Sequence, residues 1–199
     1  MAARALALAV TIVLASAPGL APAAGRRVTA QDDRGPRVNR DAKVMAEFEE
    51  RVKAYSTLHR ELERTLPSLP KEATPEQINA HQVALAALIA KTRARASAGD
   101  IFTKDTRALF RRYLARVFDG PQGRALRASI MDENPGRLRL HINARYPESI
   151  PVASVPPQVL QALPKLPDDL EYRFIGDRLI LHDIHAHTIV DVIDNAIPG

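Results

Sequence analysis

The spacing of apolar residues changes along this chain near residue 137. Before that point apolar side chains recur every three or four residues, the period that places them on one side of an α-helix. Over residues 137–145 they alternate strictly with polar ones, the period of a β-strand with one solvated face. This order of patterns predicts an α+β protein. An N-terminal helical hairpin or bundle is expected to precede a small antiparallel sheet of three or four strands.

Four helices are predicted within the helical region, residues 41–134. Their expected ranges are 41–66, 75–96, 104–118 and 122–131. The second begins with a capping box, in which Thr74 is the N-cap and Gln77 lies three residues later. Its expected buried residues are Ile78, Leu85, Leu88 and Ile89. Because a short loop joins the first two helices, we expect them to pack as an antiparallel hairpin.

The remaining residues, 135–199, are predicted to form a small β-module with a proline-rich lead-in. Its first strand would be the alternating segment 137–145, and one short helix fits within the proline-rich part at 156–163. A three-stranded meander follows from Leu170, with Gly176-Asp177 as a two-residue hairpin turn. The last connection, 184–187, places His187 where a left-handed conformation is expected, which histidine tolerates.

The N-terminus carries the pattern of a secretory signal peptide. A short positive start is followed by an apolar run over residues 5–17 and by the small-residue pattern Ala21-Pro22-Ala23. We expect cleavage near Ala23 or Ala24, which makes residues 1–24 a signal peptide and residues 25–40 a flexible basic leader. The run is shorter than the roughly 20 apolar residues that span a membrane. The mature chain is therefore predicted to be periplasmic or secreted, without a transmembrane span.

Composition and missing motifs exclude several classes of function. The chain has no cysteine, which rules out disulfides, a thiolate nucleophile and cysteine-based zinc sites. It has no G-x-S-x-G, H-E-x-x-H, P-loop or S-x-x-K pattern, so no recognisable catalytic motif points to an enzyme. A net charge of only +5 does not demand a nucleic-acid partner. No aromatic residues interleave with the basic ones in a way that would stack bases.

Charge is unevenly distributed along the mature chain. Residues 93–145 carry a net charge of +7 and residues 146–199 a net charge of −5. The basic segment includes a set of arginines on the polar sides of the third and fourth predicted helices: Arg107, Arg111, Arg112, Arg116, Arg124 and Arg127. One interpretation is a non-enzymatic protein that binds an envelope protein or an anionic envelope component through these arginines. The other is that they dock against the chain's own acidic module, and both stay open.

A histidine cluster offers an alternative function. His182, Asp183, His185 and His187 fall within six residues, where a hairpin could bring ligands for nickel, cobalt, zinc or copper together. His182 and Asp183, however, should point to opposite faces of their strand. Away from this cluster, His59 is expected to be a partly exposed helix residue and His81 to line the helical hairpin. Apart from such a metal, no cofactor is expected.

The C-terminal residues also carry a resemblance. Residues 163–193 contain a Leu-Pro lead-in, a strand around Tyr172, a turn at Gly176 and a closing Ile-Val-Asp run. This string resembles the C-terminal β-module of RcnB-like periplasmic proteins, and the resemblance implies an exported protein concerned with nickel and cobalt homeostasis. More broadly, residues 41–198 are similar to a family of uncharacterised secreted bacterial proteins with a helical body and the same ending.

Overall fold

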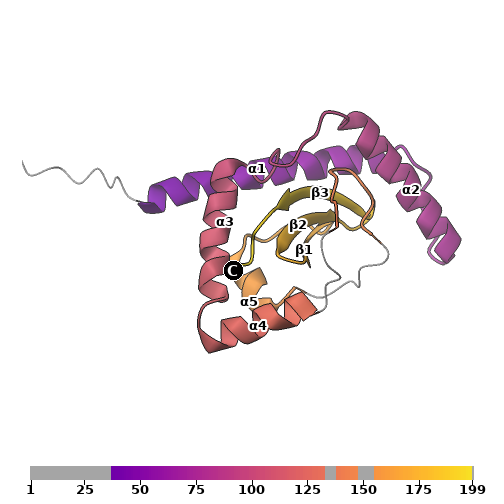
Figure 1. The fold of residues 1–199 in the computed structure, drawn as a ribbon. Coiled ribbons are helices and arrows are strands. Elements are labelled where there is room, and N and C mark those ends of the chain that lie inside the picture. Colours follow the sequence, from indigo (N-terminus) through magenta and orange to yellow (C-terminus); the bar gives the residue numbers. More distant parts are fainter. Residues whose placement is uncertain (1–36, 133–137, 148–154, 199) are drawn as a thin grey trace, which may run out of the picture. The chain divides into compact units, whose positions relative to one another are not determined.

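The computed structural model describes residues 37–132, 138–147 and 155–198 (Figure 1). Within these residues, five helices precede three strands: α1 (Arg37–Glu63), α2 (Pro75–Thr92), α3 (Lys104–Val117), α4 (Gly120–Asp132), α5 (Pro157–Ala162), β1 (Leu170–Ile175), β2 (Arg178–Asp183) and β3 (Thr188–Ile193). The predicted α+β class is confirmed. The predicted signal peptide, residues 1–24, lies outside the described residues. No helix among the described residues is both long enough and apolar enough to cross a membrane.

Helix α1 begins at Arg37, earlier than the sequence pattern predicts. The last four residues of the predicted flexible leader are therefore helical, and the rest of that leader lies outside the described residues. An apolar stripe marks only the part of a helix that is buried. Polar residues extend a helix beyond that part because each added residue completes one more backbone hydrogen bond. The apolar period of this helix, with residues spaced three or four apart, does mark its buried side: Val44, Phe48, Val52 and Tyr55 are all buried.

The start of α2 is as predicted, but one of its expected core residues is wrong. The Thr74 hydroxyl accepts a hydrogen bond from the Gln77 N–H, and the Gln77 side chain accepts one from the Thr74 N–H, so the capping box is confirmed. Leu85 and Ile89 are buried, whereas Leu88, also expected to be buried, is only partly buried. Ile78 is 41% exposed. It lies in the first part of α2, where residues 74–80 are all exposed. The apolar period continues one turn further than the surface that α2 packs against.

The three strands form one antiparallel sheet in the order β1-β2-β3. Gly176 and His187 both have a positive φ, 61° and 53° respectively, which confirms the turn positions expected from the sequence. A β-bulge interrupts the pairing of β2 with β3, since Leu181 lies opposite Asp191 but His182 lies opposite Ile189. Val190 is therefore the extra residue. The bulge turns both Val190 and Asp191 toward the helices, where Val190 joins the main hydrophobic core.

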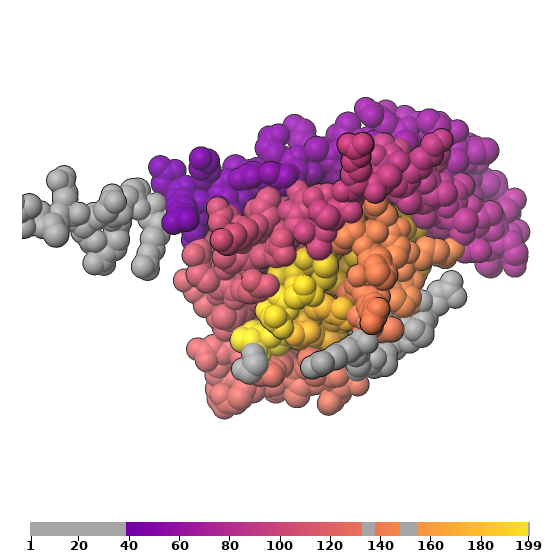
Figure 2. Space-filling model, turned by 45° about the horizontal axis from the view of Figure 1, so that its top comes forward, coloured from indigo at the N-terminus to yellow at the C-terminus, as the bar shows by residue number. Residues whose placement is uncertain are grey.

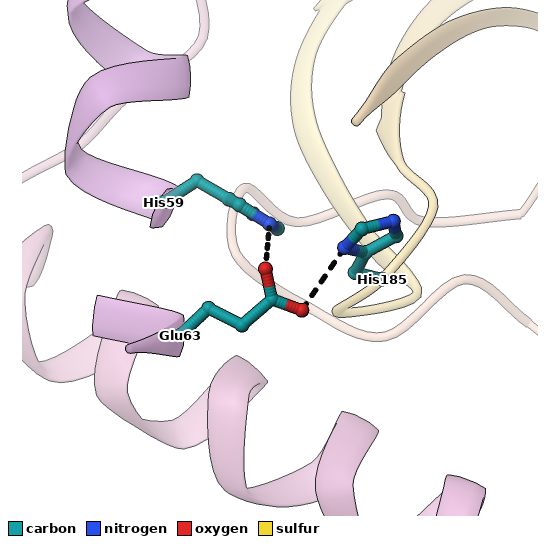
Figure 3. Close-up of side chains that lie close together, drawn as sticks. All are labelled: His59, Glu63 and His185. Carbon is teal, nitrogen blue, oxygen red and sulfur yellow. Dashed lines mark hydrogen bonds and ion pairs between the residues drawn. The ribbon is translucent and has the colours of Figure 1, made fainter. Parts of the chain in front are cut away.

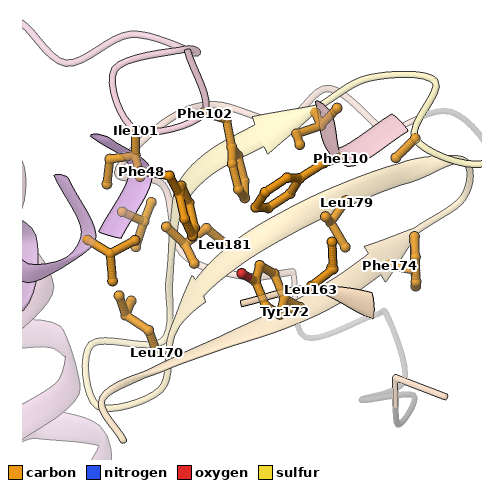
Figure 4. Packing of buried hydrophobic residues seen from close by; sticks show 14 of the residues in the cluster. Phe48, Ile101, Phe102, Phe110, Leu163, Leu170, Tyr172, Phe174, Leu179 and Leu181 are labelled. Atoms are coloured by element: carbon orange, nitrogen blue, oxygen red, sulfur yellow. The ribbon is translucent and has the colours of Figure 1, made fainter. Parts of the chain in front are cut away.

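The helices cover one face of the sheet. Rings from α1, from the α2–α3 loop and from α3 meet above Leu181 and Tyr172 (Figure 4). The Phe48 ring stacks on Phe102 at a centroid distance of 5.7 Å and meets the Phe110 ring edge-on at 5.0 Å. Because three separate elements contribute these rings, the core fixes α1 and α3 relative to the sheet.

The other face of the sheet is covered by residues 138–146, and here the predicted fourth strand is wrong. This segment makes only one isolated bridge, between Arg145 and Thr188 of β3. Asn143 has a φ of 62°, which breaks the extended conformation that a ladder needs. The alternation nevertheless identified the buried side, because the apolar residues of the segment pack on the sheet: Leu138, Leu140 and Ile142. Figure 2 shows the orange segment against the yellow C-terminal residues.

Candidate functional site

A row of buried polar side chains lies on α1 where the helix crosses the start of β1 and the end of β2. Tyr55, Ser56 and His59 are all buried and face two carboxylates of the β-module. The Ser56 hydroxyl donates to Asp169, with an oxygen–oxygen distance of 2.7 Å. Because buried polar groups need partners, this row joins the helix to the sheet at one defined position.

Asp183, the last residue of β2, is the central hydrogen-bond acceptor for this row of α1 side chains. Its carboxylate is fully buried and accepts hydrogen bonds from the Tyr55 hydroxyl at 2.6 Å and from the Ala186 N–H at 2.8 Å. It also lies 2.6 Å from Nδ1 of His59. Burial opposes the charged form of Asp183, but the hydrogen bonds from His59, Tyr55 and Ala186 hold the pKa of this carboxyl below its ordinary value. Burial likewise opposes a charged His59, but its hydrogen bond to Asp183 and the negative charges around it raise its pKa.

The other ring nitrogen of His59 lies on the side of Glu63 and His185 (Figure 3). Its Nε2 makes no hydrogen bond among the described residues and lies 3.3 Å from Oε2 of Glu63, one helical turn later. Oε1 of Glu63 lies 3.0 Å from Nδ1 of His185, which comes from the β2–β3 connection. One ligand atom from each of His59, Glu63 and His185 lies within 4.8 Å of the other two.

These three side chains form a candidate metal centre. Two imidazole nitrogens and one carboxylate oxygen are a donor set that zinc, nickel and copper accept, and three protein ligands leave a further coordination position open. Asp183 would orient His59 from behind, because a carboxylate at Nδ1 leaves Nε2 to bind the metal. His81 on α2 lies 3.6 Å from Glu63 through its Nε2, which confirms its predicted place in the helical hairpin.

The histidine cluster of the sequence is divided between the two faces of the sheet. Asp183 and His185 face α1. His182 faces the opposite side, where its Nδ1 lies 2.8 Å from Glu171 and its ring centroid lies 5.1 Å from that of His187. The four residues predicted as metal ligands therefore do not converge: His182, Asp183, His185 and His187.

Two residues of the candidate metal centre were not identified from the sequence. The expectation that His59 is partly exposed is wrong, because its imidazole is fully buried. Its position beside the apolar stripe is compatible with burial only because Asp183 supplies a charged partner. The spacing of His59 and Glu63, four residues apart on a predicted helix, was the available signal, because such pairs lie on one face.

The six arginines of α3 and α4 divide into two groups. Arg107 donates to the carbonyl of Phe102, Arg111 to the carbonyl of Asp194, and Arg112 pairs with Asp41 on α1. The side chains of the other three have no described partner: Arg116, Arg124 and Arg127. Among the described residues, Arg111 is the one member of this set with a hydrogen bond to the acidic C-terminal part, and its acceptor is the backbone carbonyl of Asp194. Binding of an anionic envelope component by these arginines stays a prediction.

Glu171, on the face opposite α1, leads to a prediction about acid stability. Burial opposes its charge, but hydrogen bonds from His182 and Arg173 hold its pKa below the ordinary value. A lowered pKa in the folded state means that Glu171 stabilises the fold above its unfolded pKa. This contribution is lost as the pH falls through the folded pKa. We expect Glu171→Gln to lower the free energy of unfolding by about 1 kcal/mol at neutral pH and by less near pH ~3.

Urea unfolding of both proteins across this pH range checks the prediction. Asp168→Asn, which changes an exposed carboxylate nearby, is the control and should leave the pH dependence of wild-type stability unchanged. An equal loss of stability at both pH values in Glu171→Gln would contradict the assignment.

Comparison of the chain with known protein families, with curated proteins and with solved structures gives no match. The resemblance of residues 163–193 to RcnB-like periplasmic proteins therefore stays a prediction. The candidate metal centre is interpreted from its own geometry.

Proposed function

We propose that this chain is an exported, non-enzymatic protein that binds one divalent transition-metal ion between His59, Glu63 and His185. The observation that carries the proposal is the convergence of three ligand atoms within 4.8 Å, with the rear nitrogen of His59 held by a buried carboxylate. Export rests on the signal-peptide pattern of residues 1–24. The periplasm is a compartment that incoming metal ions reach first, which is consistent with such a role.

The donor set supports a particular group of metals. Imidazole nitrogen suits zinc, nickel, cobalt and copper, whereas calcium and magnesium prefer a shell made of oxygen ligands. No cysteine is present to favour a softer metal. Histidine binds a metal through a deprotonated ring nitrogen, so metal affinity should fall as the pH is lowered.

The test is a calorimetric titration of Zn²⁺ and Ni²⁺ into the purified protein. We expect a single site with a Kd of about 1 μM or lower. Glu63→Gln and His185→Ala should each weaken binding by about 100-fold, because each removes one of only three protein ligands. Both side chains are partly exposed, at 30% and 49%, so these variants should remain folded.

Two substitutions outside the site serve as matched controls. Glu61→Gln changes an exposed carboxylate on the same helix, and His141→Ala removes an exposed imidazole. Both should bind the metal as the wild type does. A Kd weaker than about 1 μM for both metals, or unchanged affinity in Glu63→Gln and His185→Ala, would overturn the proposal.

A further inference from the structure

The candidate metal centre borders a surface cleft of about 660 Å³. Glu63 is part of the metal centre and also lines the cleft, because the last turns of α1 form one edge of the cleft. The other polar residues that line it are Arg60, Arg64, Ser68 and His81. A ligand in this cleft therefore lies beside Glu63, and His185, whose side chain is 49% exposed, leaves the centre accessible from solvent.

The two arginines of the cleft lie on either side of Glu63 in the sequence and both are exposed. Neither side chain has a hydrogen bond or an ion pair among the described residues. Two arginines elsewhere in the molecule are paired: Arg51 with Glu47 on α1, and Arg112 of α3 with Asp41. Arg60 and Arg64 thus keep their donors available for a ligand.

The charges around the cleft favour an anion once a metal is bound. Glu63 and Asp183 lie closest to the ligand atoms and balance a divalent cation, while Asp169 adds a further negative charge near His59. Arg60 and Arg64 form no ion pair with these carboxylates among the described residues, so their positive charges stay available to a ligand. Guanidinium groups form paired, charge-assisted hydrogen bonds with phosphate and carboxylate oxygens, and a metal with three protein ligands accepts one further oxygen.

We propose that the cleft binds a phosphate group, either free or as a small monoester, with one oxygen on the metal and others on Arg60 and Arg64. A tetrahedral phosphate has enough oxygens to contact a metal and two guanidinium groups at once, whereas a single carboxylate has two. The Ser68 hydroxyl and the His81 imidazole line the same cleft and supply further donors. This inference rests on the proposed metal centre.

The experiment loads the protein with Co²⁺ alone and then titrates inorganic phosphate. Visible absorption of cobalt depends on its ligands, so a phosphate oxygen that enters the coordination sphere should shift the spectrum in a saturable way. In the double variant Arg60→Ala with Arg64→Ala, we expect Co²⁺ to bind as in the wild type and phosphate to bind at least about tenfold more weakly.

The matched control is Arg116→Ala with Arg124→Ala, which removes the same charge from exposed positions on α3 and α4. It should leave phosphate binding unchanged. Repeating the titration with a phosphate monoester tests whether an ester is also accepted. If Co²⁺ does not bind, the proposed metal centre fails. If Co²⁺ binds but phosphate leaves the spectrum unchanged, or binds the Arg60/Arg64 variant as tightly as the wild type, the phosphate inference alone is overturned.

Discussion

Asp191→Ala is expected to lower the free energy of unfolding by about 4 kcal/mol, because it leaves several buried donors without an acceptor. The carboxylate of Asp191 is fully buried beside the β-bulge. It accepts hydrogen bonds from the backbone N–H groups of Gly99, Ile101 and Phe102 at 2.7 to 2.8 Å. These groups belong to the α2–α3 loop, which carries Phe102 into the core. The Asp191 side chain therefore holds residues 99–102 to β3.

Urea unfolding followed by circular dichroism measures this loss. Asp194→Ala is the control, because this exposed residue lies three positions later and contacts Arg111 only through its backbone carbonyl. Its effect should stay within about 0.5 kcal/mol. Amide exchange should also become faster at Ile101 and Phe102 in Asp191→Ala. A loss below about 1 kcal/mol, with the loop still protected, would show that other contacts hold the loop.

The second large effect is expected for Asp183→Ala, at about 3 to 5 kcal/mol. This substitution removes the acceptor for Tyr55 and Ala186 and leaves the buried imidazole of His59 without its fully buried carboxylate partner. Breaking a buried ion pair from one side is costly because the remaining partner cannot return to water. The junction between α1 and the sheet should therefore weaken.

Tyr55→Phe provides a graded comparison for Asp183→Ala. It removes only the hydroxyl that donates to Asp183, so the free energy of unfolding should fall by about 1 kcal/mol. Thermal and urea unfolding of the two variants, with Asp168→Ala as an exposed control, measure the difference. Equal losses in Tyr55→Phe and Asp183→Ala would contradict the central role of the His59–Asp183 pair.

Most elements of the fold could be predicted from the sequence because they rest on local patterns. The capping box at Thr74, the turn at Gly176 and the positive φ of His187 all depend on residues within one turn of each other. The segment 138–146 shows where this reasoning stops. Its alternation identified the buried side correctly, and Asn143 and Ala144 do hydrogen-bond to Ile189 of β3. The ladder does not extend further, because the positive φ of Asn143 interrupts the extended backbone.

The candidate site could be predicted only in part. The closeness of Asp183 and His185 in the sequence predicts that they belong to one site, and both lie against α1. Their neighbours His182 and His187 lie on the other face of the sheet, since side chains alternate along a strand and reverse through the turn. The spacing of His59 and Glu63 places both on one face of a helix, but nothing local indicates which strand ends that helix crosses.

The sequence by itself determined that the helices and the meander form and, apart from Ile78 and His59, which side of them is buried. These properties follow from the spacing of apolar residues in each segment, which matches the 3.6-residue period of a helix or the two-residue period of a strand. Only the tertiary structure decided that His59 meets Asp183, 124 residues later, and that Glu63 meets His185. Such contacts depend on how α1 packs across the sheet through Phe48, Phe102 and Phe110. The physical reason is that packing is a property of whole surfaces, whereas a period in the sequence describes one element at a time.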